Sequence, residues 1–152
     1  MEYAVNKAFK QENYFYTSLG NSFDPDIVTM EHIRVLIKKY HIGKIYFVLS
    51  NDNQIILDAL EGQFFSKTRG LKHVYLEITK QRKTSAMWSQ TKNPQSMILS
   101  YYLNNKIRAL QTSLSDVFYR PNSVSGIIYD RDAQVFKTIY SDLICSEKFH
   151  FN

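Results

Sequence analysis

The chain has 152 residues, of which 44% are hydrophobic and 14% aromatic, with one cysteine and a formal net charge of +5. These values predict one globular domain over residues 1–152, and they exclude a disordered chain and a fold held by internal disulfides. The longest apolar run, Ile45 to Leu49, is far shorter than the ~20 residues of a membrane span, and no secretory signal is visible, so we expect a cytoplasmic protein without membrane contact.

The first quarter of the chain predicts a helix, a strand and a second helix. Residues 2–9 place apolar side chains on one helical stripe. Residues 14–19 are aromatic and β-branched and end at Gly20-Asn21, which predicts a strand followed by a turn. Asp24-Pro25 predicts the start of the second helix, because aspartate caps free amides and proline fits the first helical position. That helix is expected to stop before Gly43.

The middle of the chain predicts two further strands and a helix between them. Residues 44–50 are apolar on both faces, which is typical of an interior strand covered by helices on each side. Asn51-Asp52-Asn53 ends this strand and opens a helix with Ile56, Leu60 and Phe64 at four-residue spacing. Residues 71–78 alternate between apolar and polar side chains, which predicts the next strand.

The last third of the chain predicts a long helix and a hairpin. Asn93-Pro94 repeats the pattern of a capped helix start. The expected buried stripe of this helix consists of Leu99, Leu103, Ile107, Leu110 and Leu114. Residues 124–129 and 134–140 flank a polar turn at 130–133, which predicts a C-terminal β-hairpin. The apolar tail over residues 142–152 is expected to pack on the body of the domain or on a partner chain.

This order of elements predicts an α/β domain with a mostly parallel central sheet of about four to five strands, helices on both faces and a C-terminal hairpin. Ligands of such sheets bind beyond the carboxyl ends of the strands. The candidate ligand-binding residues at those ends are Gly20, Asn21, Ser50, Asn51, Asp52 and Asn53. Amides at a helix start there suit a small anion or metabolite, although capping of the helix by the same triplet is the simpler interpretation.

Positive charge is concentrated in one segment. Residues 66–92 hold seven bases and one acid, which leaves the rest of the chain with a net charge of −1. Clustered cations bind polyanions because phosphate binding releases counterions. The candidate polyanion-binding residues are Lys67, Arg69, Lys72, Lys80, Arg82 and Lys83. Only Tyr75 and Trp88 of this segment could stack on bases, so a solvated loop is the favoured interpretation and nucleic acid is not the expected partner.

Several segments together resemble the β-class carbonic anhydrases. Gly20-Asn21, residues 29–31 (TME) and residues 44–51 (KIYFVLSN) are similar to the family's Gly-Asn turn, the start of its next helix and its apolar strand that ends in Gly-His-x-x-Cys. Residues 103–110 (LNNKIRAL) and 126–130 (GIIYD) resemble its late helix and the opening of its final hairpin. The resemblance spans residues 14–140.

The zinc ligands of that family are missing from this chain. The family binds zinc with two cysteines and one histidine, and the corresponding positions here are Asn51 for the histidine and Gln54 for the second cysteine. An alternative alignment, which places Ser18 at the first cysteine, also lacks a ligand. Amides are poor zinc ligands, and without zinc nothing lowers the pKa of water toward 7. The resemblance therefore implies no metal, no cofactor and no carbonic anhydrase activity.

No other catalytic pattern stands out. The four histidines are scattered, Cys145 is the sole thiol, and the glycine-rich and serine motifs of nucleotide-binding and acyl-transfer enzymes do not occur. We therefore expect a non-catalytic, carbonic-anhydrase-like domain that acts as a dimeric binding or interaction module. The dimer rests on the habit of the resembled family and on the apolar tail. Binding of a small anion at the strand ends and binding of a polyanion at the basic segment are the alternatives.

Overall fold

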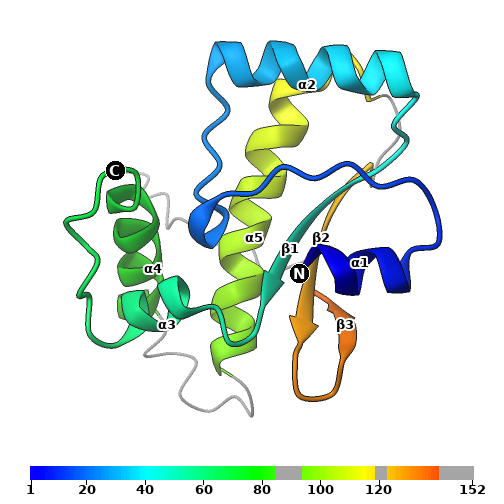
Figure 1. Cartoon of the computed structure of the whole chain (residues 1–152). Coiled ribbons are helices and arrows are strands. Elements are labelled where there is room, and N and C mark those ends of the chain that lie inside the picture. Colours follow the sequence, from blue (N-terminus) through cyan, green and yellow to red (C-terminus); the bar gives the residue numbers. More distant parts are fainter. Residues whose placement is uncertain (85–93, 119–122, 141–152) are drawn as a thin grey trace, which may run out of the picture.

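The structure is a computed structural model that describes residues 1–84, 94–118 and 123–140, with side chains left out over 81–84 and at 94. Figure 1 shows the helices and strands in chain order. They are α1 (Glu2–Ala8), the short 3-10 helix η1 (Leu19–Asn21), α2 (Ile27–Tyr40), β1 (Ile45–Ser50), α3 (Gln54–Leu60), α4 (Lys72–Thr84), α5 (Pro94–Ser113), β2 (Val124–Asp130) and β3 (Val135–Thr138).

A three-stranded mixed sheet lies at the centre, in the order β1-β2-β3. β1 and β2 are parallel, with Phe47 opposite Gly126, and β2 and β3 form the antiparallel hairpin. Helix α5 packs along one face, where a Cβ on Gly126 would lie 3.1 Å from Cδ1 of Ile107. On the other face the Phe9 ring lies 5.4 Å from that of Tyr46, at the end of α1. One long helix and one short helix therefore cover opposite faces of a small sheet.

The caps of two helices follow from asparagine and aspartate side chains. Oδ1 of Asp26 accepts hydrogen bonds from the amides of Val28 and Thr29, both at 3.0 Å, so α2 begins two residues later than Asp24 predicts. The helix ends at Tyr40, where His41 takes a left-handed conformation, two residues before Gly43. Asn53 caps α3 in the same way as Asp26 caps α2.

Several predictions from the sequence are confirmed. The helix over residues 2–9, the strand over 44–50, the long helix that starts at Pro94 and the C-terminal hairpin are all present. The predicted stripe of α5 is buried throughout. None of the helices in the described ranges is long and apolar enough to cross a membrane. The tail over 142–152 lies outside the described residues.

The predicted sheet of about four to five mostly parallel strands is wrong, because the described residues form three strands with one parallel pair. β1 is an edge strand, since only β2 pairs with it among these residues. Residues 14–18 form no strand. Instead, their rings pack on neighbouring aromatic side chains, with Tyr14 lying 4.7 Å from Tyr40 and Tyr16 lying 5.8 Å from Phe23.

The predicted strand over residues 71–78 is also wrong, because these residues enter helix α4. Leu71, Val74, Tyr75 and Ile78 are buried, which is the three- and four-residue spacing of a helix. In the strand interpretation Leu76 would be buried and Tyr75 exposed, whereas Leu76 is 61% exposed and Tyr75 only 3%. The Tyr75 side chain is part of the hydrophobic core, and its burial next to Val74 fits a helix and not a strand.

Candidate functional site

The residues predicted at the strand ends do come together. Nδ2 of Asn21 donates a hydrogen bond to the carbonyl oxygen of Val48, at 3.1 Å, and so fixes η1 beside β1. Gly20 has a φ of +57° and lies close to Ile55. A Cβ added at position 20 would lie 3.1 Å from Cγ2 of Ile55. From α5, the Tyr102 hydroxyl donates to the carbonyl oxygen of Gly20 at 2.8 Å. Burial and the nearby negative charge of Glu77 raise the pKa of Tyr102, which keeps this hydroxyl a donor.

The polar groups of this corner bind one another. The backbone amide of Arg131 donates to Oδ1 of Asn51 at 3.3 Å, and Nε2 of Gln95 donates to the Asn51 carbonyl oxygen at 2.8 Å. Asp52 accepts from the Ser50 hydroxyl and forms an ion pair with Nε of Arg131 at 3.1 Å. Oδ1 of Asn53 accepts hydrogen bonds from the amides of Ile55 and Ile56. The corner therefore ties β1, α3, α5 and the hairpin together, which favours the capping interpretation over an anion site.

Arg131 and Gln95 were not predicted at this corner. Each is far from residues 51–53 in the sequence, and no motif links them to that triplet. The only available signal is indirect, since the turn at 130–133 follows a strand that was expected in the same sheet. Long-range polar pairs of this kind have no local sequence pattern.

The residues at the zinc positions of the resembled family do not fit a zinc ion. Oδ1 of Asn51 faces the Arg131 amide, and the Gln54 side chain donates to the Asp52 carbonyl oxygen at 3.1 Å. Within the described ranges, no group of three or more His, Cys, Asp and Glu side chains is placed to hold a metal ion. Cys145 lies outside those ranges.

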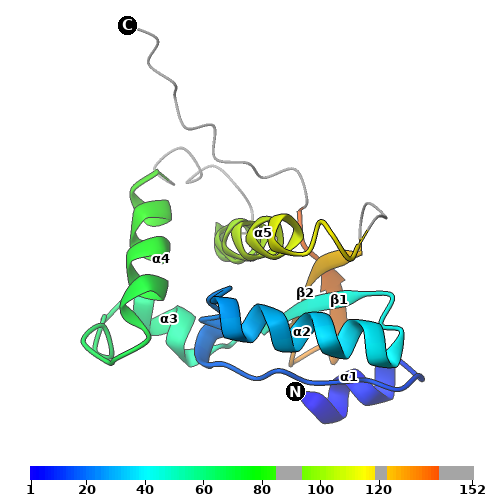
Figure 2. The same cartoon turned by 90° about the horizontal axis from the view of Figure 1, so that it is seen from above.

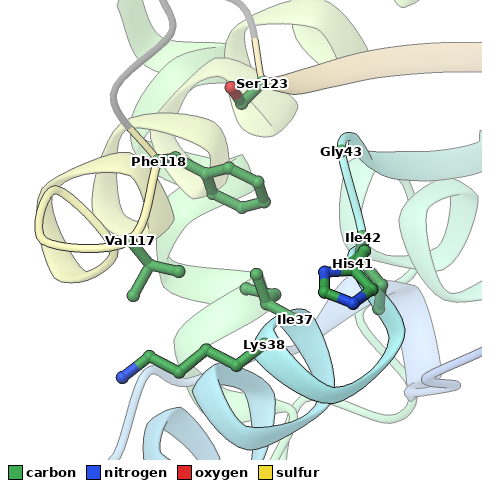
Figure 3. A pocket seen from close by; sticks show the side chains of 8 residues that line it. All are labelled: Ile37, Lys38, His41, Ile42, Gly43, Val117, Phe118 and Ser123. Atoms are coloured by element: carbon green, nitrogen blue, oxygen red, sulfur yellow. The ribbon is translucent and has the colours of Figure 1, made fainter.

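A hollow of about 460 Å³ lies at the opposite end of the parallel strands, where β1 and β2 begin. Figure 3 shows the Ile37 and Phe118 side chains facing it, while the Lys38 side chain extends past it toward the outside. The other lining residues are His41, Ile42, Gly43, Val117 and Ser123. The described lining is mostly apolar and contains neither a carboxylate nor a thiol, so it suits an apolar group better than acid–base or nucleophilic chemistry.

The most distinctive exposed surface is the turn between α3 and α4 together with the first part of α4, residues 61–80, here called the aromatic–basic arm. Phe64 is 84% exposed and Phe65 is 51% exposed. The exposed cations of the arm are Lys67, Arg69, Lys72 and Lys80. Arg82 and Lys83 also belong to α4, but their side chains lie outside the described residues. Figures 1 and 2 both place α4 on the far side of α5 from the β2–β3 hairpin.

One carboxylate holds the two phenylalanines of the arm in place. Asp58 of α3 accepts hydrogen bonds from the amides of Phe64 and Phe65, at 3.0 and 3.1 Å, and from the Tyr75 hydroxyl. Desolvation acts to raise the pKa of Asp58, but these hydrogen bonds outweigh it and lower the pKa below its usual value. Burial and the same hydrogen bond raise the pKa of Tyr75 to about 12. The Phe64 ring lies against Gly62, where a Cβ would clash with it.

A second carboxylate attaches the arm to α5. Oε1 of Glu77 accepts a hydrogen bond from Nδ2 of Asn105 at 2.9 Å, and its Oε2 lies 3.4 Å from Nζ of Lys106. Both charged side chains are largely buried, at 14% and 10% exposure. The ammonium group also lies 5.4 Å from the centre of the Tyr102 ring. Phe64 and Phe65 therefore lie in a turn between α3 and α4, and α4 is attached to α5 by these contacts.

No family model, no curated protein and no solved structure matches the chain. Its function is therefore inferred from its own residues and their arrangement.

Proposed function

We propose that the protein is a binding module that holds single-stranded nucleic acid on the aromatic–basic arm. The observation that carries this proposal is the exposure of Phe64 and Phe65 beside four exposed cations. Proteins that bind single strands without strict sequence preference combine aromatic rings, on which bases stack, with Lys and Arg side chains that neutralise the phosphates. The arm has both kinds of group within one short stretch.

The charge balance of the arm supports an anionic partner. Its two acids are Glu61 and Glu77, and the second is paired with Lys106 in the α4–α5 interface. Lys67, Arg69, Lys72 and Lys80 of the arm are exposed. A phosphate backbone meets mainly cations on this surface.

The sequence disfavours nucleic acid because the basic segment is defined to begin at residue 66, and only the aromatic residues inside that segment are counted. That count leaves out Phe64 and Phe65, which precede the first basic residue, Lys67, by three and two positions. It also includes Tyr75, which is buried and holds Asp58 instead of facing solvent. The proposal keeps the expectation of a module without catalysis, and the resemblance to the β-class carbonic anhydrases remains a separate proposal.

The test is fluorescence anisotropy with a labelled single-stranded oligonucleotide of about 16 nucleotides, near the upper site size of such proteins. Phe64→Ala is expected to weaken binding about tenfold, because stacking of a base on an aromatic ring contributes about 1–3 kcal/mol. Val135→Ala removes an exposed apolar side chain from the distant hairpin and is the matched control, with affinity unchanged.

Salt dependence supplies the second readout. Phosphate contacts by the four exposed cations predict a slope of log K against log salt of about −2 to −3, at about −0.7 for each contact with a single strand. Lys67→Glu with Lys72→Glu should make this slope shallower. A flat salt response, or full affinity in Phe64→Ala, contradicts the proposal. Binding to anionic phospholipid vesicles without binding to the oligonucleotide contradicts it as well.

A further inference from the structure

The hollow at the start of the parallel strands has the size and the walls of a small-molecule site. Its volume of about 460 Å³ falls within the range of roughly 300–1,000 Å³ that is usual for ligand pockets. Ile37 faces it from α2 and Phe118 faces it from the turn after α5, and Ile42 and Val117 add further apolar surface (Figure 3). These walls favour an apolar ligand group, because contact with them removes its surface from water.

Backbone hydrogen bonds fix two sides of the hollow. The amide of Ile42 donates to the carbonyl oxygen of Ile37 at 3.1 Å and so closes the end of α2. The amide of Ile45 donates to the carbonyl oxygen of Ser123 at 2.8 Å and joins the starts of β1 and β2. These two sides are therefore formed without a ligand, as is usual for binding pockets.

Basic side chains stand at the rim on the side of α2. Lys38 and His41 are the only titratable residues of the described lining, and both are exposed. His41 takes a left-handed conformation, with a φ of +52°, and its ring lies at the edge of the hollow (Figure 3). The C-terminal end of a helix carries about half a negative charge. Lys38 and Lys39, both in the last turn of α2, outweigh it, so the rim attracts an anion.

The acid next to the lining is already paired. Asp116 precedes Val117 in the sequence, and its Oδ2 lies 3.3 Å from Nε of Arg34. Nη2 of the same arginine donates to the carbonyl oxygen of Ser113 at the end of α5. Arg34 therefore offsets the charge of this carboxylate, which leaves the positive charge of Lys38 in place at the rim.

We propose that the hollow binds a fatty acid of medium chain length, with its alkyl chain against Ile37 and Phe118 and its carboxylate beside the ammonium group of Lys38. Lysine suits this position, because its alkyl part covers apolar surface while its charged end stays in water. One lysine in the described lining matches one negative charge on the ligand. The lining comes from α2, the loop before β1, the turn after α5 and the start of β2, and such a surrounded space favours a small molecule over an extended peptide.

The test is isothermal titration calorimetry of the full chain with octanoate, octanol and octyltrimethylammonium, which share an alkyl chain and differ in the charge of the head group. Octanoate is expected to bind at one site, about fivefold more tightly than octanol, as one exposed ion pair allows. Octyltrimethylammonium should bind most weakly. Hexanoate, which is two methylene groups shorter, should bind about tenfold more weakly than octanoate because it buries less apolar surface.

Two substitutions separate the head-group contact from the apolar contact. Lys38→Met should weaken octanoate about fivefold and leave octanol unchanged, and Lys7→Met on α1 is the matched control. Val117→Glu adds a carboxylate to the lining, so it should abolish octanoate binding and improve binding of the cationic compound. Val28→Glu places the same charge on an exposed valine of α2 outside the described lining and should change neither. Circular dichroism confirms that each variant is folded.

Several outcomes overturn the proposal. These are the absence of saturable octanoate binding, equal affinity for the three head groups, and an equal loss of octanoate and octanol in Lys38→Met. Octanoate binding that is lost in Phe64→Ala and kept in Val117→Glu places the fatty acid on the aromatic–basic arm instead. A peptide of alternating leucine and glutamate that binds while octanoate does not shows that the occupant is a protein. Oligonucleotide affinity should be the same in Lys38→Met and in wild type, so this proposal and that for the arm fail independently.

Discussion

Asp58 shows how one side chain can organise an exposed surface. Its carboxylate bonds the amides of two consecutive phenylalanines and the Tyr75 hydroxyl, so the backbone of Phe64 and Phe65 is held although their rings are in solvent. A carboxylate is suited to this task because its two oxygens can accept several hydrogen bonds at once. The neighbouring Gln63 has a φ of +56°, which is a strained value for a residue with a side chain and needs such support.

The lowered pKa of Asp58 predicts how its contribution depends on pH. Because the folded state holds the pKa below the usual 3.8, stabilisation by the carboxylate is complete well above pH 3.8 and is lost as the pH falls through the folded-state value. Asp58→Asn should therefore lower the melting temperature at pH 7, and the difference from wild type should shrink below pH 4. Differential scanning calorimetry measures this. Asp132→Asn, an exposed carboxyl in the hairpin turn, is the control. An equal difference at pH 7 and at pH 3 contradicts the assignment.

The α4–α5 pair shows which elements a sequence can predict. Helix α5 follows from its capped start and from five apolar residues at helical spacing, and both signals are local. Residues 71–78 fit a period of two through Val74, Leu76 and Ile78 and also fit a helical period through Leu71, Val74, Tyr75 and Ile78. The choice depends on whether Tyr75 is buried, and its hydroxyl is bonded to Asp58, 17 residues earlier, which no local pattern reveals. The sequence likewise predicts that residues 50–53 lie at a strand end, but it does not predict their contacts with Gln95 and Arg131.

The same helix pair contains a buried ion pair whose loss should be costly. Lys106→Met leaves the Glu77 carboxylate largely buried without its cation, and breaking such a pair destabilises a protein by about 3–5 kcal/mol. The double variant with Glu77→Gln removes the stranded charge and should regain part of that loss. Urea unfolding of wild type, both single variants and the double variant gives the coupling energy. Additive effects of the two substitutions would show that the pair contributes nothing beyond its separate parts.

At the scale of the whole molecule, α5 lies between the aromatic–basic arm and the β2–β3 hairpin (Figures 1 and 2). A substitution on the hairpin therefore leaves the arm untouched, which is why Val135→Ala is the control for Phe64→Ala.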